Sequence, residues 1–458
     1  MNHNSPKITV YITNFNYADY IDKAIQSVLE QSFKDFELII IDDGSTDGSR
    51  EIINSYEKTK NVFLVFQKNK GLNKTNNTAI KLSRGKYIMR LDADDYLDPR
   101  AFEIMVSELE SRPEVALVFP DYYLIDEQGN ILKQIRRHDF TKEVTLLDQP
   151  AHGACTLIRK EFLLQIGGYN ESFDRQDGYD LWLSITKKYP IRNINLPLFY
   201  YRQHTSNLTK NEEQLLKVRS QIMANHVKKR EIKKATTIAV IPVRGRELDP
   251  RSLPLVQLGR KKLIDWTIDA ALESTVIDDV VISTPNETVQ NHVTKKYGSK
   301  VHIFERSINQ ARINEPLEPV LLEVSQSYSK NVSTPDILAV LFIEAPFRSP
   351  FYIDKAVHTK QLYEVDVVDG IREEDDIFYY HNGDGLQPWN LSSNLRLERD
   401  ILYRRVGGIH VIDRKHLESQ QNLLSGKIGH IAIDQRAAFT IRSEFDWKIA
   451  QQIAAMEN

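Results

Sequence analysis

The chain contains a single cysteine, Cys155, in 458 residues. A lone cysteine excludes an internal disulfide framework and a metal site built from several thiolates. The chain also has no large excess of charge of either sign, since it contains 60 basic and 63 acidic residues. The resulting net charge of −3 gives no indication of a polyanionic partner, and we expect no nucleic acid to bind.

Long hydrophobic runs are also missing. No apolar stretch approaches the roughly 18 residues that a transmembrane helix needs, and the polar residues 1–6 do not resemble a signal peptide. We therefore expect a cytoplasmic protein without a transmembrane segment, whose contact with a membrane, if any, is peripheral. The length predicts two or three domains, because one hydrophobic core rarely serves so long a chain.

The first half of the chain alternates predicted strands and helices. The expected strands are residues 7–12, 36–41, 62–67 and 86–91, and the expected helices between them are 20–31, 49–56 and 72–82. This order predicts an α/β fold with a doubly wound sheet and right-handed crossovers. In such a sheet, ligands bind beyond the carboxyl ends of the strands, which is where polar clusters at 13–17, 42–47 and 92–95 lie.

The cluster after the fourth strand is the most acidic of the three. Strand alternation predicts that Asp92 and Asp94 point the same way, with Ala93 leaving room between them. Two adjacent carboxylates suit Mg²⁺ or Mn²⁺, which proteins commonly share with a ligand's phosphates. The alternative is an acidic turn after a core strand. The convergence of three polar clusters on one sheet edge favours the metal site.

Several motifs in the same order resemble the family 2 glycosyltransferases. They are residues 13–16 (TNFN), 41–47 (IDDGSTD), 69–71 (NKG), 84–88 (RGKYI) and 91–95 (LDADD). The resemblance covers roughly residues 6–210. It implies a GT-A fold, a nucleotide-sugar donor, and inverting, metal-dependent transfer of a sugar to a hydroxyl group. The expected acceptor is a glycan or a protein-linked glycan in the synthesis of surface polysaccharide or glycoprotein.

The resemblance also assigns site residues. Those expected to bind the donor are Thr13, Asn14, Asn16, Asp42, Asp43, Lys70, Asp92, Ala93 and Asp94. Asp94 and Asp92 are the expected ligands of Mn²⁺ or Mg²⁺, and His204 is a further candidate because residues 200–207 resemble the family's closing loop.

The catalytic base implied by the resemblance is an acidic residue at the start of a helix near residue 180. Asp177 and Asp180 both fit this position. We favour Asp177, which lies at the helix entrance, while Asp180 is equally suited to a helix start that favours negative charge. Inversion then needs one in-line displacement, with the base on the acceptor hydroxyl and no covalent enzyme intermediate.

The second half begins after a charged helical segment, residues 211–235. Residues 236–458 resemble the cytidylyltransferases that make CMP-activated nine-carbon sugars. The matching motifs are residues 241–245 (IPVRG), 254–255, 263–268 (LIDWTI), 281–284, 346–348, 407–411 and 446–450. We therefore expect three parts: a GT-A domain (1–210), a helical linker (211–235) and a cytidylyltransferase-like domain (236–458).

Three departures from that second family concern its chemistry. Residues 246–249 (RELD) replace a Gly-Ser-Lys segment that holds the triphosphate, and Glu344 stands in a loop that carries Gln-Pro. Thr440 and Arg442 occupy the positions of two metal-binding aspartates, and arginine does not bind Mg²⁺. We expect a non-catalytic domain that either forms a homodimer, as such synthetases commonly do, or docks another partner, or still binds a CMP-sugar without making it. The alternatives are a bifunctional CMP-sugar synthetase and glycosyltransferase, or a non-enzymatic assembly scaffold.

Overall fold

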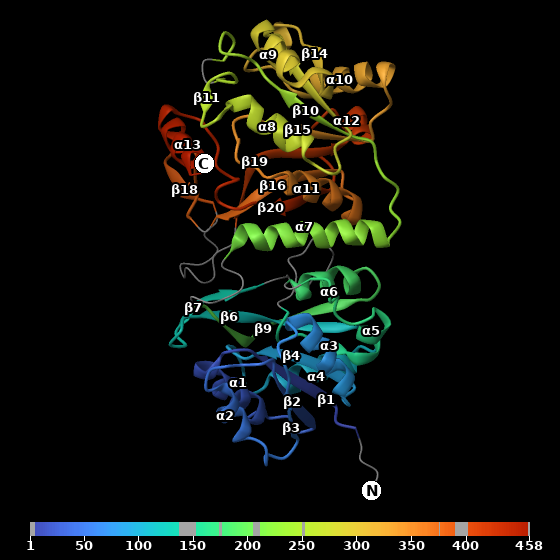
Figure 1. Ribbon diagram of the computed structural model, residues 1–458, viewed down its shortest axis with the longest axis vertical. Helices are drawn as coiled ribbons and strands as arrows, with labels where there is room; N and C mark the ends of the chain where they lie inside the picture. The colour runs from blue at the N-terminus through green and yellow to red at the C-terminus, as the bar shows by residue number, and fades with distance from the viewer. Residues whose placement is uncertain are drawn as a thin grey trace. The chain divides into compact units, whose positions relative to one another are not determined.

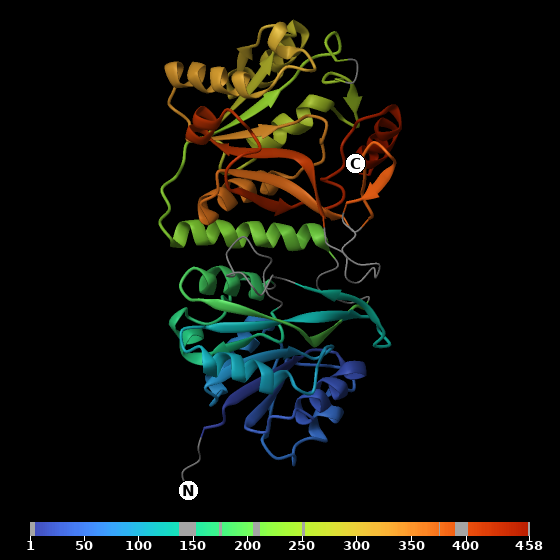
Figure 2. The same cartoon turned by 180° about the vertical axis from the view of Figure 1, so that it is seen from behind.

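A computed structural model describes residues 5–136, 153–173, 176–204, 211–249, 252–374, 376–389 and 402–456, without the side chain of Asp177. The chain forms two compact units and passes from the first to the second between Asn211 and Glu212 (Figures 1 and 2). Among the residues described, no helix has the length and apolar character needed to cross a membrane.

The first unit is built on a mixed nine-stranded sheet. Four parallel strands lie in the order β3 (Val62–Phe66), β2 (Phe36–Asp42), β1 (Ile8–Asn14) and β4 (Tyr87–Asp92). The sheet continues through β8 (Leu157–Arg159), β6 (Leu117–Ile125), β9 (Ile191–Arg202) and β5 (Tyr96–Leu97), and β7 (Ile131–Ile135) pairs with β6. Because β8 runs antiparallel between β4 and β6, the parallel half ends at β4.

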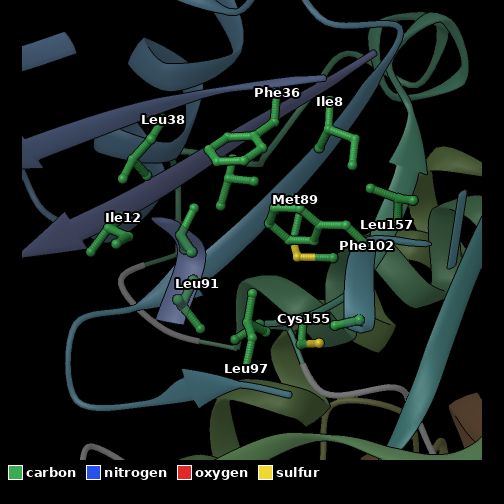
Figure 3. Close-up of a cluster of buried hydrophobic side chains, with 14 of the residues drawn as sticks. Ile8, Ile12, Phe36, Leu38, Met89, Leu91, Leu97, Phe102, Cys155 and Leu157 are labelled. Atoms are coloured by element: carbon green, nitrogen blue, oxygen red, sulfur yellow. The ribbon is translucent and has the colours of Figure 1, made fainter. Parts of the chain in front are cut away.

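Six helices of the described chain belong to this unit: α1 (Ala18–Leu29), α2 (Ser49–Asn54), α3 (Leu72–Leu82), α4 (Ala101–Ser111), α5 (Lys160–Gln165) and α6 (Asp177–Thr186). One hydrophobic cluster joins α1, α2 and α4 to the strands. Figure 3 shows part of it, with Met89 of β4 beside Phe102 of α4 and Leu157 of β8, and with Leu91 of β4 nearer to Leu97. Since side chains alternate along a strand, Arg90 and Asp92 point to the opposite face of β4.

The predicted α/β alternation of this half is confirmed. The observed strands agree with the predicted ones to within two residues, and α3 has the predicted bounds. One detail differs. Strand β4 ends at Asp92, and the Asp95 amide donates to the Asp92 carbonyl at 3.2 Å to close a turn. Asp94 therefore lies in a turn, and strand alternation does not decide where its side chain points.

The second unit has a seven-stranded sheet. Its order is β14 (Val301–Glu305), β13 (Asp279–Thr284), β10 (Thr237–Pro242), β15 (Ile337–Leu341), β19 (Leu402–Asp413), β16 (Val367–Glu374) and β20 (Ile428–Ala432). The first four strands are parallel, and β19 runs antiparallel to both of its neighbours. The nucleotide-binding α/β architecture expected from the sequence is thus present in both units.

The helices of the second unit are α7 (Glu212–Lys229), α8 (Leu263–Leu272), α9 (Glu287–Tyr297), α10 (Glu318–Asn331), α11 (Pro350–Tyr363), α12 (Arg414–Gln420) and α13 (Glu444–Ala455). Helix α7 covers most of the predicted linker. It packs against α11, buries Leu216, Ile222 and Met223, and donates a hydrogen bond from Ser220 to the Phe351 carbonyl. By its contacts, α7 is part of the second unit.

Two small hairpins complete the second unit. Strands β11 (Gln257–Leu258) and β12 (Lys261–Lys262) precede α8, while β17 (Tyr379–His381) and β18 (Leu386–Pro388) form a separate two-stranded sheet. Short 3₁₀ helices cover Gly298–Lys300 and Asn309–Ala311.

Candidate active site

The loops after β1 and β2 are joined by polar side chains. The Asn14 amide donates to Asp42 Oδ1 at 3.1 Å and to the Ser45 hydroxyl at 2.9 Å, which in turn accepts the Asn16 backbone amide. Asn16 adopts a left-handed conformation (φ 61°), and its side chain accepts the Thr46 amide at 2.8 Å. Three of the predicted donor-binding residues, Asn14, Asn16 and Asp42, are thereby brought together.

Asp42 is fully buried at the end of β2. Besides Asn14, it accepts hydrogen bonds from the Ser45 amide and from Arg50 Nε, the latter at 2.8 Å. Burial acts to raise the pKa of this carboxyl, but the hydrogen bonds from Ser45, Arg50 and Asn14 outweigh it and hold the pKa below its usual value. Asp42 is therefore an ionised group that organises both loops.

Asp43 organises a third loop, which leads into α3. Its Oδ1 accepts the Gln67 side-chain amide and the Lys70 backbone amide, and its Oδ2 accepts the Gly71 amide at 2.9 Å. A carboxylate oxygen has two lone pairs, so these three bonds leave Oδ2 with capacity for another donor. Lys70 thus contributes its backbone here, while its ammonium lies 3.3 Å from Gln67 Oε1.

A glycine is required where the loop after β2 approaches the loop that leads into α3. Gly44 has φ of 88°, and a Cβ at this position would lie 2.8 Å from the Asn69 backbone nitrogen. The close approach of the β2 loop to residues 69–71 therefore depends on the absence of a side chain.

Asp92 is held by a neighbour on its own strand. Arg90, which is 5% exposed, places Nε 2.9 Å from Asp92 Oδ1 and Nη2 3.1 Å from Oδ2. Thr13 pairs with Asp92 across β1 and β4 and lies at the same edge of the sheet. Ala93, in contrast, is buried in the hydrophobic cluster, so its methyl group packs inward.

Asp94 contacts the end of β9. Its Oδ2 lies 2.8 Å from His204 Nε2, and both residues are buried. The imidazole stacks on Tyr20 with ring centroids 5.4 Å apart and meets Tyr17 edge-on at 5.8 Å. The predicted proximity of Asp94 and His204 is therefore present in the structure.

The turn that carries Asp94 is anchored by Arg202. The Arg202 amide donates to Asp95 Oδ1 at 2.9 Å, and its guanidinium donates to the Asp94 carbonyl at 3.0 Å. The guanidinium also lies 4.9 Å from the centre of the Tyr20 ring. The guanidinium donates further hydrogen bonds to the carbonyls of Asp126 and Glu127.

The turn carries an excess of negative charge. Burial, and then the charges of Asp94 and Asp92, raise the pKa of the Asp95 carboxyl well above its usual value. Burial and the same carboxylates also raise the pKa of Tyr17. A divalent cation bound at this position would relieve the repulsion among the three carboxylates.

The residues present fit such a cation. A carboxylate and an imidazole are suitable ligands for Mn²⁺, and Asp92 is partly exposed beside them. Within the described ranges, no group of three or more His, Cys, Asp or Glu residues is arranged to hold a metal by itself. Magnesium-type sites often use one or two carboxylates and complete their shell with substrate phosphates and water, which agrees with this arrangement. Direct ligation by His204 Nε2 would replace its hydrogen bond to Asp94.

The candidate bases lie at the start of α6. Asp177 is the first residue of the helix, but its side chain lies outside the described part of the structure. Asp180, almost one turn further, is 6% exposed. The helix is preceded by Gln176 in a left-handed conformation (φ 61°), and the Tyr179 and Asp180 amides both donate to the Gln176 carbonyl. The structure therefore leaves both candidates open.

Different residues stand at the carboxyl ends of the parallel strands in the second unit. Arg246 and Glu247 are exposed, and the amide of Arg442 donates to Asp446 Oδ2 at 2.9 Å, next to the start of α13. Arg348 is buried and donates to the carbonyls of Ala345 and Gly408. Arg348 thus binds backbone carbonyls, while the Asp446 carboxylate accepts a main-chain amide at the start of α13.

Sequence reasoning had missed Arg90, Tyr17 and Tyr20. Arg90 could have been found from the sequence. Residues two apart on a strand share a face, so a basic residue two positions before Asp92 can pair with it. No sequence pattern indicated Tyr17 and Tyr20, since their contact with His204 joins segments nearly 190 residues apart in the chain.

Two family models match the chain. The one described as glycosyl transferase family 2 matches residues 9–167, and the one described as cytidylyltransferase matches residues 253–332. Both resemblances inferred from the motifs are thereby confirmed.

Individual relatives match part of the chain. A chondroitin synthase of Escherichia coli is 32% identical over 192 residues, which cover 42% of this chain and 28% of the synthase. The chain thus spans less than a third of that relative. Among solved structures, residues 1–349 of S. aureus TarS match at 18% identity with a TM-score of 0.40, covering 48% of this chain and 66% of that one.

An uncharacterised glycosyltransferase of Methanocaldococcus jannaschii is 31% identical over 205 residues, covering 43% of this chain and 71% of the relative. Because this relative is matched over more than two thirds of its length, and the family model covers the strands β1 to β4 and the acidic turn after them, the chain belongs to glycosyl transferase family 2.

Proposed function

We propose that the protein is a metal-dependent, inverting glycosyltransferase that moves a sugar from a nucleotide-sugar donor to a hydroxyl group of a glycan. The observation that carries this proposal is the acidic turn at Asp92, Asp94 and Asp95. It lies at the same sheet edge as the loops of Asp42 and Asp43, in a domain of glycosyl transferase family 2.

The nucleoside side of the donor is assigned to the loops after β1 and β2. Asp42 orients Asn14 and Ser45, since its oxygens accept their hydrogen bonds and it is fully buried. Asp43 is better placed to accept a hydrogen bond from the base or the ribose, because its Oδ2 has a lone pair left beside the Gly71 amide. Thr13 and Asn16 border the same loops.

The diphosphate side is assigned to Asp92 and Asp94. Asp94, with Asp92 and with His204 beside it, would hold Mn²⁺ or Mg²⁺, which when bound neutralises charge on the departing diphosphate. Asp177 at the start of α6 accepts the proton of the acceptor hydroxyl, so that the oxygen attacks the anomeric carbon in a single displacement. The relative named chondroitin synthase supports a polysaccharide acceptor.

Replacing Asp94 with Asn tests the metal assignment. The substitution keeps the size of the side chain and removes the negative charge, and we expect it to abolish sugar transfer while the protein stays folded. The measurement is transfer from a panel of UDP-, GDP-, dTDP- and CMP-sugars with Mn²⁺, alongside thermal unfolding. Asp35→Asn, at an exposed site in the same unit, is the control. Undiminished transfer by Asp94→Asn would refute the assignment.

The two candidate bases are separated by a pair of matched variants. We expect Asp177→Asn to lower transfer by about 10²-fold or more, the usual contribution of a general base, and to leave hydrolysis of the donor by water in place. Asp180→Asn should affect transfer far less. The reverse ranking, measured with the same donor and acceptor, would assign the base to Asp180 and disprove our choice.

The second unit is proposed to be non-catalytic. Support comes from Arg442 and Thr440, which stand where the related synthetases carry metal-binding carboxylates. A guanidinium at this position repels a divalent cation and cannot become a ligand.

This proposal is tested with the full chain, CTP, Mg²⁺ and a set of nine-carbon sugars. We expect no release of pyrophosphate above that of a protein-free control. The same measurement is made with the Asp94→Asn variant, in which we expect no sugar transfer by the first unit. Pyrophosphate release over many turnovers would instead show that the second unit is a working CMP-sugar synthetase, and the protein would then be bifunctional.

The second unit is also proposed to form a homodimer, through the β17–β18 hairpin. Four large apolar side chains of this hairpin and the residue after it are more than half exposed: Tyr379 (55%), Tyr380 (53%), Leu386 (66%) and Trp389 (71%). An apolar cluster of this kind on a surface is typical of an interaction site. Two copies of the hairpin would cover each other's apolar side chains in a two-fold dimer.

Leu386→Ser together with Trp389→Ser should convert the dimer into a monomer without unfolding the chain, because both side chains are already exposed. The molar mass in solution, measured by sedimentation or by light scattering over a concentration series, reports the change. Leu424→Ser is the matched control, since Leu424 is 58% exposed in the same unit but lies outside the hairpin. A dimer that persists in the double variant would exclude the hairpin as its interface.

A further inference from the structure

Arg90 is a buried cation in the middle of the candidate site. It lies on β4 between Met89 and Leu91, whose side chains enter the hydrophobic cluster, and its own side chain points to the opposite face with Asp92. Only 5% of its surface is exposed, and its fork contacts both oxygens of Asp92 at 2.9 and 3.1 Å. A charge that is nearly buried in this way needs a partner, and Asp92 supplies one.

The Arg90 guanidinium also lies against the backbone of Gly153. A Cβ on Gly153 would lie 2.9 Å from Arg90 Nη2 and 3.4 Å from Cζ, so that the glycine allows the chain to pass directly over the guanidinium. Gly153 in turn touches the start of α6, because a Cβ on Gly178 would lie 3.0 Å from Gly153 Cα and 3.2 Å from its nitrogen. Gly178 follows Asp177 directly.

These contacts form one stack from the acidic turn to the base-bearing helix: Asp92, Arg90, Gly153 and Gly178. We propose that Arg90 is a positioning residue for glycosyl transfer, which sets the distance between the donor carboxylates and the first turn of α6. This inference rests on the proposed function, because it gives α6 the catalytic base. Arg90 itself is not expected to touch the donor or the acceptor.

A guanidinium suits this role better than an ammonium. Its planar fork can contact both oxygens of one carboxylate and still present a flat face to the backbone on its other side. Lysine keeps the charge but offers a single flexible donor group, so the carboxylate and the glycine would no longer be held in one fixed geometry.

The test uses two substitutions that leave every carboxylate in place. Arg90→Lys removes the fork, and Gly153→Ala pushes a methyl group against Arg90 Nη2. We expect each to lower acceptor transfer by about 10-fold to 100-fold, the scale expected for a misplacement of about 1 Å. Hydrolysis of the same donor by water should fall much less, because water does not need the base at one fixed position.

The ratio of transfer to hydrolysis separates positioning from simple loss of folded enzyme. Damage to the fold would lower both rates by the same factor, and an unchanged ratio in both variants would overturn the proposal. Gly48→Ala is the control, because its methyl group would lie 3.9 Å from the nearest neighbouring atom, at an ordinary contact distance. It should leave both rates unchanged.

The double variant provides a further check. Lysine leaves room where the guanidinium was, so Gly153→Ala should have little additional effect in the Arg90→Lys background. Full additivity of the two effects would show that they act independently and would contradict the stack, since residues in contact are expected to be non-additive.

Hydrogen exchange makes the proposal testable apart from enzyme activity. Amide exchange in a peptide covering the start of α6 should be faster in Arg90→Lys and Gly153→Ala than in the unchanged chain, whichever donor the enzyme uses. Unchanged exchange there would refute the link to α6. If the unchanged chain shows no turnover with any donor, the proposed function fails, while faster exchange in the variants would still establish the stack.

Discussion

The hydrogen bond between Asp94 and His204 is the contact on which the candidate site depends. It joins a turn after the fourth strand to the end of the ninth, 110 residues later in the chain, at a distance of 2.8 Å. Arg202 reinforces the junction by binding the Asp94 carbonyl and the Asp95 carboxylate. Three carboxylates are thus held together although they repel one another, and burial raises the pKa of Asp95 further. This stored repulsion is what a bound cation would release.

The two units use similar sheets in different ways. In the first, carboxylates gather at the carboxyl ends of the parallel strands, and their hydrogen bonds tie the neighbouring loops together. In the second, Arg348 binds the Gly408 carbonyl, and the Asp446 carboxylate accepts the Arg442 amide at the start of α13. The second unit thus keeps an α/β sheet while different residues stand at its edge. A shared fold therefore does not imply a shared activity.

Particular elements show why much of the fold was predictable. Helix α1 lies within two residues of its predicted bounds because Ile21, Ala24, Ile25 and Val28 recur at helical spacing, and all four are buried. The continuous apolar run at residues 36–41 indicated a strand buried on both faces, and β2 is buried throughout. The insertion of β8 between β4 and β6 was not predictable in this way, because pairing between strands some 70 residues apart depends on the whole sheet.

The sequence by itself determined the α/β class of both halves, the families they resemble, and the acidic turn as the centre of the first. Local periodicity and motif order suffice for these, since they depend on residues close together in the chain. Only the tertiary structure decided which partners the carboxylates have: Arg90 for Asp92, His204 for Asp94, and the Lys70 and Gly71 amides for Asp43. These partners come from other strands and loops or from one face of a strand, and only folding brings their atoms within hydrogen-bonding distance.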